Sequence, residues 1–219
     1  MNVVVLVMDT ARAKTVLTDD GVAFSNLSRL ASEGTQYTSA FANAPWTLPS
    51  HASLFTGTSP SKHGAHAGHK HLNDSLRTLP EALSAAGYET LGVTNNAWIT
   101  DEFGFERGFD EYHRAWQYRQ SNVDVGPLTM GPGNAGLSRE IATKLFEGNP
   151  VTNLLNALYG KLFYRRSDSG ARRTNEIATD LVSSHSSPFF LFLNYLEPHL
   201  EYDPPEAFAA EYQYPNGLP

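Results

Sequence analysis

The strongest hydrophobic pattern in the chain is a continuous run of apolar and β-branched residues from Asn2 to Met8. Such a run is typical of a strand that is buried on both faces in a parallel sheet. The run stops at Asp9. The pattern therefore predicts that a carboxylate lies at the carboxyl end of a buried strand.

Segments with apolar residues at helical spacing alternate with short strand-like runs along the rest of the chain. This alternation predicts an α/β fold with a doubly wound, mostly parallel sheet and helices on both faces. Ligands of such folds collect beyond the carboxyl ends of the strands. The predicted helices are Phe24 to Glu33, one that begins near Pro49 or Ser50, Thr78 to Ala86 and Arg173 to Ser183; the further strand-like runs are Thr35 to Asn43, Glu89 to Thr94 and Phe189 to Leu196.

The alternation is interrupted between residues 117 and 169, where glycine and proline are frequent. We expect an irregular insertion there, with one helix near Thr152 to Phe163. The insertion is expected to belong to the same domain as the remainder of residues 1–219.

The amino-acid composition excludes several classes of binding partner and of metal or redox site. The formal net charge of −7 provides no basic field that would gather nucleic acid, so we expect no nucleic-acid partner. The absence of cysteine excludes disulfides and thiolate metal sites. The N-terminal apolar run is too short for a signal peptide or a membrane span, and we therefore expect a cytoplasmic protein.

The most informative polar segment contains Thr47, followed closely by Pro49 and Ser50, where a helix is predicted to begin. Free N–H groups and the positive end of the helix dipole would attract an anion bound beside the Thr47 hydroxyl. The alternative is that Thr47 merely caps the helix.

Four segments together resemble the sulfatase family of the alkaline phosphatase superfamily. The core motif of that family is Cys or Ser, any residue, Pro, Ser and Arg, followed by a Thr-Gly pair. The corresponding segments in this chain are Thr47 to His51 with Thr56-Gly57, Val4 to Arg12, Gly87 to Thr90, and Glu197 to His199 with Tyr202 and Pro204.

The resemblance implies that the chain is an N-terminal portion of a catalytic domain with the alkaline phosphatase/sulfatase fold. The remaining metal ligands of the family lie in a downstream Asp-His-Gly or Asp-Asn motif, which this sequence does not contain. Three explanations stay open. The chain is a fragment, its metal site is completed differently, or the site is not functional.

The resemblance also implies that Asp9 and Thr47 bind a divalent cation. A carboxylate at the end of a strand suits a hard cation, although Asp9 could instead cap the following loop. The second Asp of the family is replaced by Thr10. This loss makes calcium less certain than manganese, magnesium or zinc.

The family motif has Cys or Ser where this chain has Thr47. Oxidation of a threonine would give a ketone, so the formylglycine cofactor of sulfatases cannot form there. A threonine alkoxide remains a good nucleophile towards phosphorus. We therefore expect metal-dependent hydrolysis of small anionic phosphate mono- or diesters, or phosphoryl transfer. The alternatives are sulfuric ester hydrolysis without formylglycine and a non-catalytic, anion-binding remnant of the fold.

The same resemblance implies roles for two histidines. His51 stands where the motif has Arg and could orient the nucleophile, or could simply be buried. His199 corresponds to the histidine that contacts the substrate oxyanion and could protonate the leaving group. Its alternative is a turn residue fixed by Pro198.

Four residues are expected to bind substrate. Asn95 and Asn96 take the place of a Lys-Trp-His stretch and could donate hydrogen bonds to a phosphate oxygen, or could simply form a turn. Lys62 and His63 lie in a segment expected to form a surface loop that attracts an anionic ester. The histidines that follow, at positions 66, 69 and 71, match no defined zinc-ligand spacing.

Overall fold

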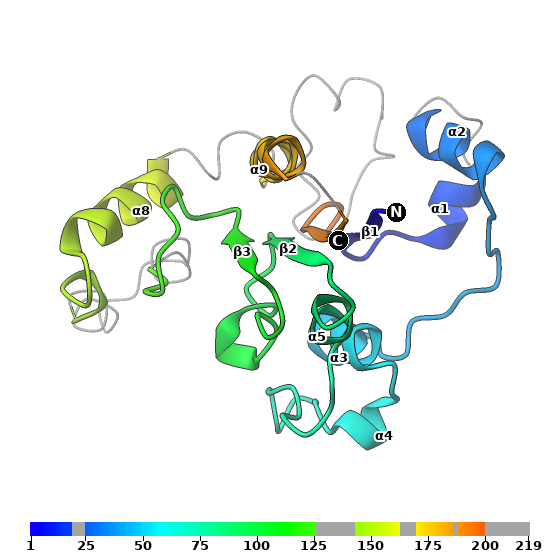
Figure 1. Ribbon diagram of the computed structural model, residues 1–219, viewed down its shortest axis with the longest axis horizontal. Coiled ribbons are helices and arrows are strands. Elements are labelled where there is room, and N and C mark those ends of the chain that lie inside the picture. Colours follow the sequence, from blue (N-terminus) through cyan, green and yellow to red (C-terminus); the bar gives the residue numbers. More distant parts are fainter. Residues whose placement is uncertain (19–24, 126–142, 163–169, 186–187, 200–219) are drawn as a thin grey trace, which may run out of the picture.

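The protein was analysed as a computed structural model, which describes residues 1–18, 25–125, 143–162, 170–185 and 188–199. Four strands in these residues form one parallel sheet with the order β1-β4-β2-β3 (Figure 1). The expected α/β class with a parallel sheet is confirmed. The strands are β1 (Val3–Met8), β2 (Glu89–Thr94), β3 (Glu111–Arg114) and β4 (Phe189–Tyr195).

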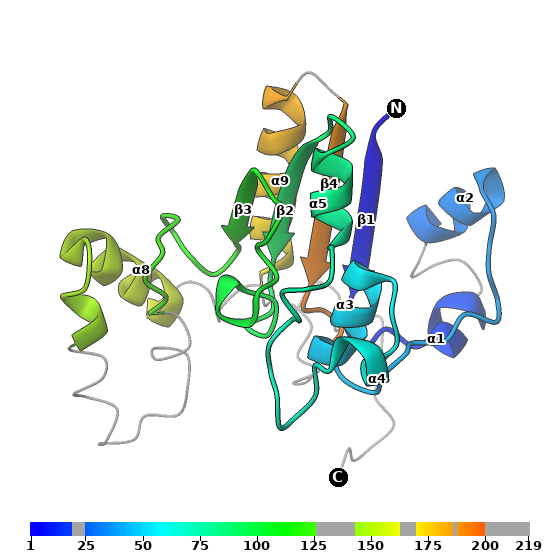
Figure 2. The same ribbon diagram turned by 60° about the horizontal axis from the view of Figure 1, so that its bottom comes forward.

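Helices cover both faces of this sheet, as Figure 2 shows. Helices α3 (Thr47–Thr56) and α5 (Leu79–Ser84) lie on one face, and α9 (Ala171–Ser184) lies on the other. Side chains of a strand alternate between its two faces. In β4, Phe190 and Phe192 therefore enter the core beneath α3, and Leu191 and Leu193 enter the core beneath α9.

Strand β1 is buried on one face only, which corrects the expectation that both faces are buried. Val3, Val5 and Val7 pack against the core beneath α3. Val4 and Leu6 point to the opposite face and are 54% and 50% exposed. The reason is position, because β1 pairs only with β4 among the described strands and lies at the edge of the sheet.

The predicted helices agree with the structure within a few residues. Thr78 caps the start of α5, because its hydroxyl accepts the N–H of Glu81 and the Glu81 carboxylate accepts the N–H of Thr78. The remaining helical segments are α1 (Ala13–Thr18), α2 (Ser25–Glu33), α4 (Pro60–His63), the 3₁₀ turn η1 (Asp101–Phe103) and α8 (Pro150–Leu162).

The strand expected from Thr35 to Asn43 is wrong. These residues join no described sheet, and the side chains of Tyr37 and Phe41 are 79% and 88% exposed. Alternation predicts a strand only when one face can be buried against the core. Parts of the expected irregular insertion, residues 126–142 and 163–169, lie outside the described residues.

No helix in the described parts of the chain is both long and apolar enough to cross a membrane.

Replacement of Phe192 by Ala is expected to lower the free energy of unfolding by about 3–5 kcal/mol. The Phe192 ring is completely buried and lies 5.0 Å from the ring of Phe55 and 6.1 Å from that of His51, so its removal leaves a cavity. Urea denaturation measures this change. Leu30→Ala, at a position that is 64% exposed, is the control and should change stability by less than about 0.5 kcal/mol.

Candidate active site

Helix α3 begins at Thr47, immediately after an extended residue, Trp46, with φ −147° and ψ 165°. Trp46 therefore holds the capping position, and the Thr47 hydroxyl is directed elsewhere. It donates a hydrogen bond to Oδ2 of Asp9 at 3.1 Å. The helix starts two or three residues earlier than its sequence pattern predicted, and this brings Thr47 into its first turn.

The Asp9 carboxylate joins three segments that are distant in the sequence. Its backbone N–H donates to the carbonyl of Tyr195 at 2.9 Å, which holds it against the end of β4. Its Oδ2 accepts both the Thr47 hydroxyl and, at 2.6 Å, the side-chain amide of Asn96, which follows β2. Asp9 is only 7% exposed, so these polar contacts replace most of its hydration.

Asn96 is itself held in place on the other side. Its Oδ1 accepts the backbone N–H of Trp98 at 2.9 Å, while one of its two amide hydrogens points to Asp9. Asn96 and its neighbour Asn95 are 5% and 3% exposed. Asn96 therefore contacts the Asp9 carboxylate directly and leaves one hydrogen for another acceptor.

Thr10, directly after Asp9, has a φ of 59°, in the left-handed region that a β-branched residue rarely adopts. Such a conformation costs on the order of 1–3 kcal/mol and persists only where its surroundings enforce it. The turn that it creates directs the chain away from the sheet just where Asp9 faces Thr47.

His51 contacts the backbone carbonyl of Thr47 and not its hydroxyl. Nδ1 of His51 lies 2.9 Å from the Thr47 carbonyl and must donate to it, and Nε2 then accepts the amide of Asn194 at 3.5 Å. Burial lowers the pKa of His51, although the Thr47 carbonyl and the Asp9 charge both oppose this shift. A neutral imidazole satisfies both contacts.

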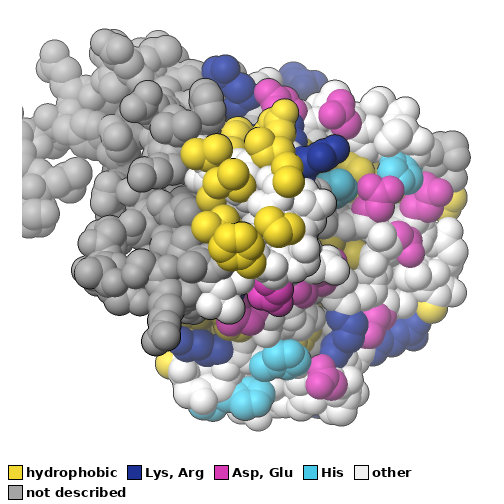
Figure 3. Space-filling model, turned by 90° about the vertical axis from the view of Figure 1, so that its left-hand side faces the viewer, with side chains coloured by type: hydrophobic (Ala, Val, Ile, Leu, Met, Phe, Trp, Pro, Cys, Tyr) yellow, Lys and Arg dark blue, Asp and Glu magenta, His cyan; other side chains and the backbone are white. Residues whose placement is uncertain are grey.

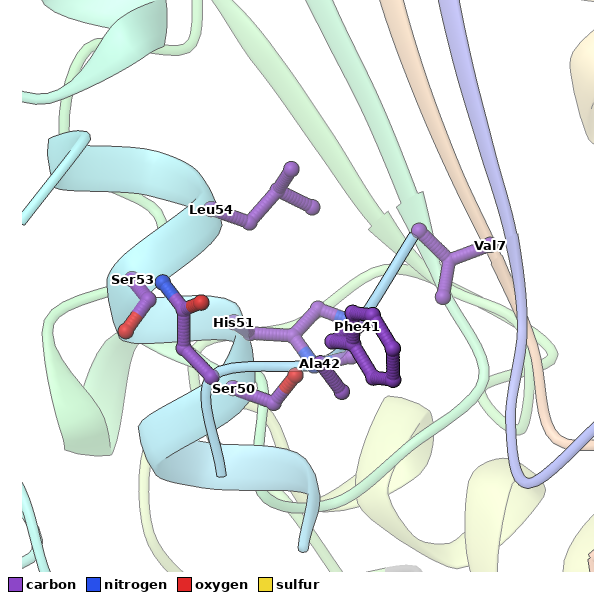
Figure 4. Close-up of a pocket in the computed structure, with 8 residues that line it drawn as sticks. Val7, Phe41, Ala42, Ser50, His51, Ser53 and Leu54 are labelled. Atoms are coloured by element: carbon purple, nitrogen blue, oxygen red, sulfur yellow. The ribbon is translucent and has the colours of Figure 1, made fainter. Parts of the chain in front are cut away.

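A cavity of about 380 Å³ adjoins α3 on the side of β1 (Figure 4). His51 forms part of its wall, so the cavity is next to the helix that begins with Thr47. The lining residues are Val7, Phe41, Ala42, Asn43, Ser50, His51, Ser53 and Leu54.

His199 lies beyond the carboxyl end of β4, at the same edge of the sheet as Asp9. Its backbone N–H donates to the carbonyl of Leu196 at 2.9 Å, so a turn fixes its position. Its side chain is partly buried. His199 and Asp9 therefore lie at the same edge of the sheet, and the role of His199 stays a prediction.

His63 is buried, which corrects its expected place on a surface loop. The residue is 1% exposed; Nδ1 accepts the N–H of Ala65 at 3.1 Å, and Nε2 donates to the hydroxyl of Ser53 at 3.0 Å. Burial lowers its pKa as well. Both nitrogens therefore bind α3 and its own turn, whereas the preceding residue, Lys62, is exposed.

Two features beside the site were not predicted from the sequence. Asn194 is fully buried inside the apolar strand β4, and its Oδ1 has no hydrogen-bond partner there. The ring of Trp98 packs edge-on against Trp46 at 5.6 Å and lies beneath the Lys70 ammonium at 4.7 Å. The sequence signal that could have identified Asn194 is its polar side chain within an otherwise apolar strand.

The oxygen donors at Asp9 fit part of a divalent-cation site. Magnesium and calcium require six or more oxygen ligands. Asp9 and Thr47 offer a carboxylate and a hydroxyl whose oxygens are 3.1 Å apart. No group of three His, Cys, Asp or Glu residues that could hold an ion occurs in the portion of the chain that the structure describes.

Comparison with known proteins identifies relatives of the whole chain. A family model described as Sulfatase matches residues 1–217. Human (Homo sapiens) iduronate 2-sulfatase is 25% identical over 249 residues, an alignment that covers 100% of this chain and 41% of that protein.

Two solved structures share the fold. The phosphonate monoester hydrolase of Agrobacterium radiobacter gives a TM-score of 0.63 at 17% identity, covering 97% of this chain and 44% of that one. A putative sulfatase from Bacteroides thetaiotaomicron gives 0.58 at 18% identity, covering 90% and 35%. The chain thus spans less than half the length of these relatives.

The free energy of unfolding is expected to fall when the pH is lowered below about 6.5. Burial lowers the pKa of both His51 and His63 from the ordinary value of 6.5. Between that value and the lowered pKa, the unfolded chain binds protons that the folded chain does not, so stability rises with pH in this window and is fully present above it.

Urea denaturation between about pH 5.5 and pH 7.5 measures this dependence. His51→Gln and His63→Gln should each flatten the slope, whereas His66→Gln, at an exposed position, should leave it unchanged. A slope in His51→Gln equal to that of the unaltered chain would contradict the assignment of His51.

Proposed function

We propose, since this chain belongs to the sulfatase family, that its Thr47 hydroxyl is the nucleophile in the hydrolysis of phosphate mono- or diesters or in phosphoryl transfer. The observation that carries the proposal is the 3.1 Å hydrogen bond from Thr47 to Asp9 at the start of α3. This bond directs the hydroxyl hydrogen towards the carboxylate and leaves the oxygen lone pairs available for attack on phosphorus.

The first turn of α3 supports binding of the anionic group. The first N–H groups of a helix have no partner inside the helix, and the dipole adds positive potential there. An ester phosphate placed against this turn would lie beside the Thr47 oxygen. Attack forms a bond from that oxygen to phosphorus and breaks the bond to the leaving-group oxygen, which gives a phosphothreonine that water then hydrolyses.

Asp9 and Asn96 act in this scheme as a pair. The carboxylate accepts the Thr47 hydrogen, and the Asn96 amide, at 2.6 Å, fixes its orientation. A divalent cation held in part by Asp9 and Thr47 would supply the positive charge that stabilises the oxyanions and lowers the pKa of the hydroxyl. The candidate cations are manganese, magnesium, calcium and zinc.

The remaining polar residues have supporting roles in the proposal. His199 protonates the leaving group from beyond β4, and Asn95 donates to a phosphate oxygen. Lys62 attracts the anionic ester from the surface. His51 holds the backbone of Thr47 by a hydrogen bond to the Thr47 carbonyl. His63 has no role in the proposal, because both of its ring nitrogens are hydrogen-bonded, to Ser53 and to Ala65.

Phosphate is favoured over sulfate because the residue at position 47 is threonine, which cannot become formylglycine. The similarity to a phosphonate monoester hydrolase agrees with chemistry at phosphorus. Hydrolysis of a sulfuric ester by unmodified threonine is the second candidate, favoured by the similarity to iduronate 2-sulfatase.

Thr47→Ala is expected to lower kcat by roughly 10³-fold or more, because it removes the attacking oxygen. The assay uses p-nitrophenyl phosphate, bis-p-nitrophenyl phosphate and p-nitrophenyl sulfate, with manganese, magnesium, calcium and zinc in turn. Asp9→Asn should lose activity as well, whereas Thr179→Ala, on the exposed side of α9, should retain it. Mass spectrometry of the peptide that contains Thr47 should detect a bound phosphoryl group.

Turnover of p-nitrophenyl sulfate alone would favour the second candidate. Absence of turnover with all three esters and all four metals would contradict catalysis by this chain and favour the anion-binding alternative. Activity that survives Thr47→Ala would exclude Thr47 as the nucleophile.

A further inference from the structure

Asn194 is a polar residue at a completely buried position of strand β4. Side chains of a strand alternate between its faces, so Asn194 points to the same core as Phe190 and Phe192, beneath α3. Its Oδ1 has no hydrogen-bond partner among the described residues. An unpaired carbonyl oxygen in a core lowers stability, and an apolar side chain of similar volume would avoid this penalty. The amide is therefore expected to serve a purpose other than stability.

The Asn194 amide nitrogen selects the tautomer of His51. This nitrogen lies 3.5 Å from Nε2 of His51, and an amide nitrogen can only donate, so Nε2 must accept. The ring hydrogen then resides on Nδ1, which lies 2.9 Å from the Thr47 carbonyl and donates to it. The opposite neutral tautomer would turn a ring lone pair towards the carbonyl oxygen and a ring hydrogen towards the amide hydrogens. Asn194 thus favours the tautomer that binds Thr47.

Packing alone does not hold the His51 ring in this orientation. The ring of Phe192 meets it edge-on at 6.1 Å, but His51 also forms part of the wall of the cavity of about 380 Å³ (Figure 4). A side chain that borders a cavity has room to change its rotamer, whereas one in a close-packed core does not. The contacts to Asn194 and to the Thr47 carbonyl hold the ring at both of its nitrogens.

The next residue of β4 holds the partner of Thr47. The Tyr195 carbonyl accepts the backbone N–H of Asp9 at 2.9 Å. Consecutive residues of one strand therefore act on the two groups that form the 3.1 Å hydrogen bond between the Thr47 hydroxyl and Asp9. Asn194 acts on Thr47 through His51, and Tyr195 acts on Asp9 through its backbone.

We propose that Asn194 is a positioning residue, which orients the Thr47 hydroxyl by setting the tautomer and the rotamer of His51. Its effect on catalysis rests on the proposed function, because it requires Thr47 to be the nucleophile, whereas its effect on the His51 ring does not. A displacement of a reacting group by about 1 Å can lower a rate roughly 100-fold. The amide should therefore raise kcat and leave the binding of the ester unchanged.

Asn194→Leu tests the proposal, because leucine has a similar volume and no hydrogen-bond donor. With p-nitrophenyl phosphate, kcat should fall roughly 10- to 100-fold while KM changes less than about twofold. The matched control is Phe190→Leu, which alters another position of the same strand and the same core. It should lower stability but leave kcat within about twofold of the unaltered chain.

Helix α8 provides a surface control. Leu154 is 51% exposed there, and Figure 3 shows hydrophobic side chains gathered on this side of the molecule. Leu154→Ser should leave both kcat and the His51 tautomer unchanged. Circular dichroism checks that every variant is folded.

Nuclear magnetic resonance reads the tautomer independently of activity. In the full chain with nitrogen-15-labelled histidine, couplings between ring hydrogens and ring nitrogens distinguish a hydrogen on Nδ1, on Nε2 or on both. The His51 signal is identified by its loss in His51→Gln. The unaltered chain should carry the His51 hydrogen on Nδ1. Asn194→Leu should populate the Nε2 form as well and should shift the methyl signal of Thr47, whereas Phe190→Leu should do neither.

The two readouts separate this proposal from the proposed function. No turnover by the unaltered chain, together with the expected changes in the His51 and Thr47 signals, would reject the function and support the positioning role. A His51 hydrogen on Nε2 or on both nitrogens of the unaltered chain would overturn the positioning role, and this test does not depend on the folding of Asn194→Leu. A tautomer that is the same in Asn194→Leu, or one that changes while the kcat of an active chain does not, would overturn it too.

Discussion

The geometry of the site depends on the hydrogen bonds that Asp9 makes. It receives the hydroxyl of Thr47 from the start of α3 and the amide of Asn96 from the segment after β2, while its own N–H is bound at the end of β4. Loss of any one of these bonds would leave a nearly buried charge or donor unsatisfied, which is costly. The three segments are therefore constrained to meet at one point of the sheet edge.

The sheet makes this meeting possible because its strands are parallel. β1, β2 and β4 all end at the same edge, so residues that follow them gather there. Helix α3 is held over that edge by packing, since Leu48, Ala52 and Phe55 join the same core as Phe190 and Phe192. His51 belongs to this supporting layer. Its neutral imidazole connects the Thr47 carbonyl to Asn194 across the core, so the position of the hydroxyl is coupled to the packing beneath it.

The sequence predicted the strands and site residues whose positions follow from the local pattern of apolar and polar residues. The runs that became β1, β2 and β4 are apolar or β-branched, and parallel topology then places Asp9 near Asn96 without knowledge of any contact. Strand β3 was missed because Glu111–Arg114 is polar and short, and only its pairing with β2 makes it a strand. The burial of His63 depends on Ser53, ten residues earlier, and no periodicity reports a contact of that kind.

The proposed chemistry depends on the charges that lie around the Asp9 carboxylate. Asp9 is negative and an ester phosphate is negative, so their approach is repulsive unless positive charge lies between them. The two hydrogen bonds to Oδ2 reduce the repulsion but carry no net charge. The cationic side chains at Lys62 and Lys70 are exposed, and Lys70 is placed over the Trp98 ring. A cation bound at the carboxylate itself would convert this repulsion into attraction. Such a cation needs further oxygen ligands around Asp9. Whether the Thr47 hydroxyl acts as a nucleophile therefore depends on those ligands.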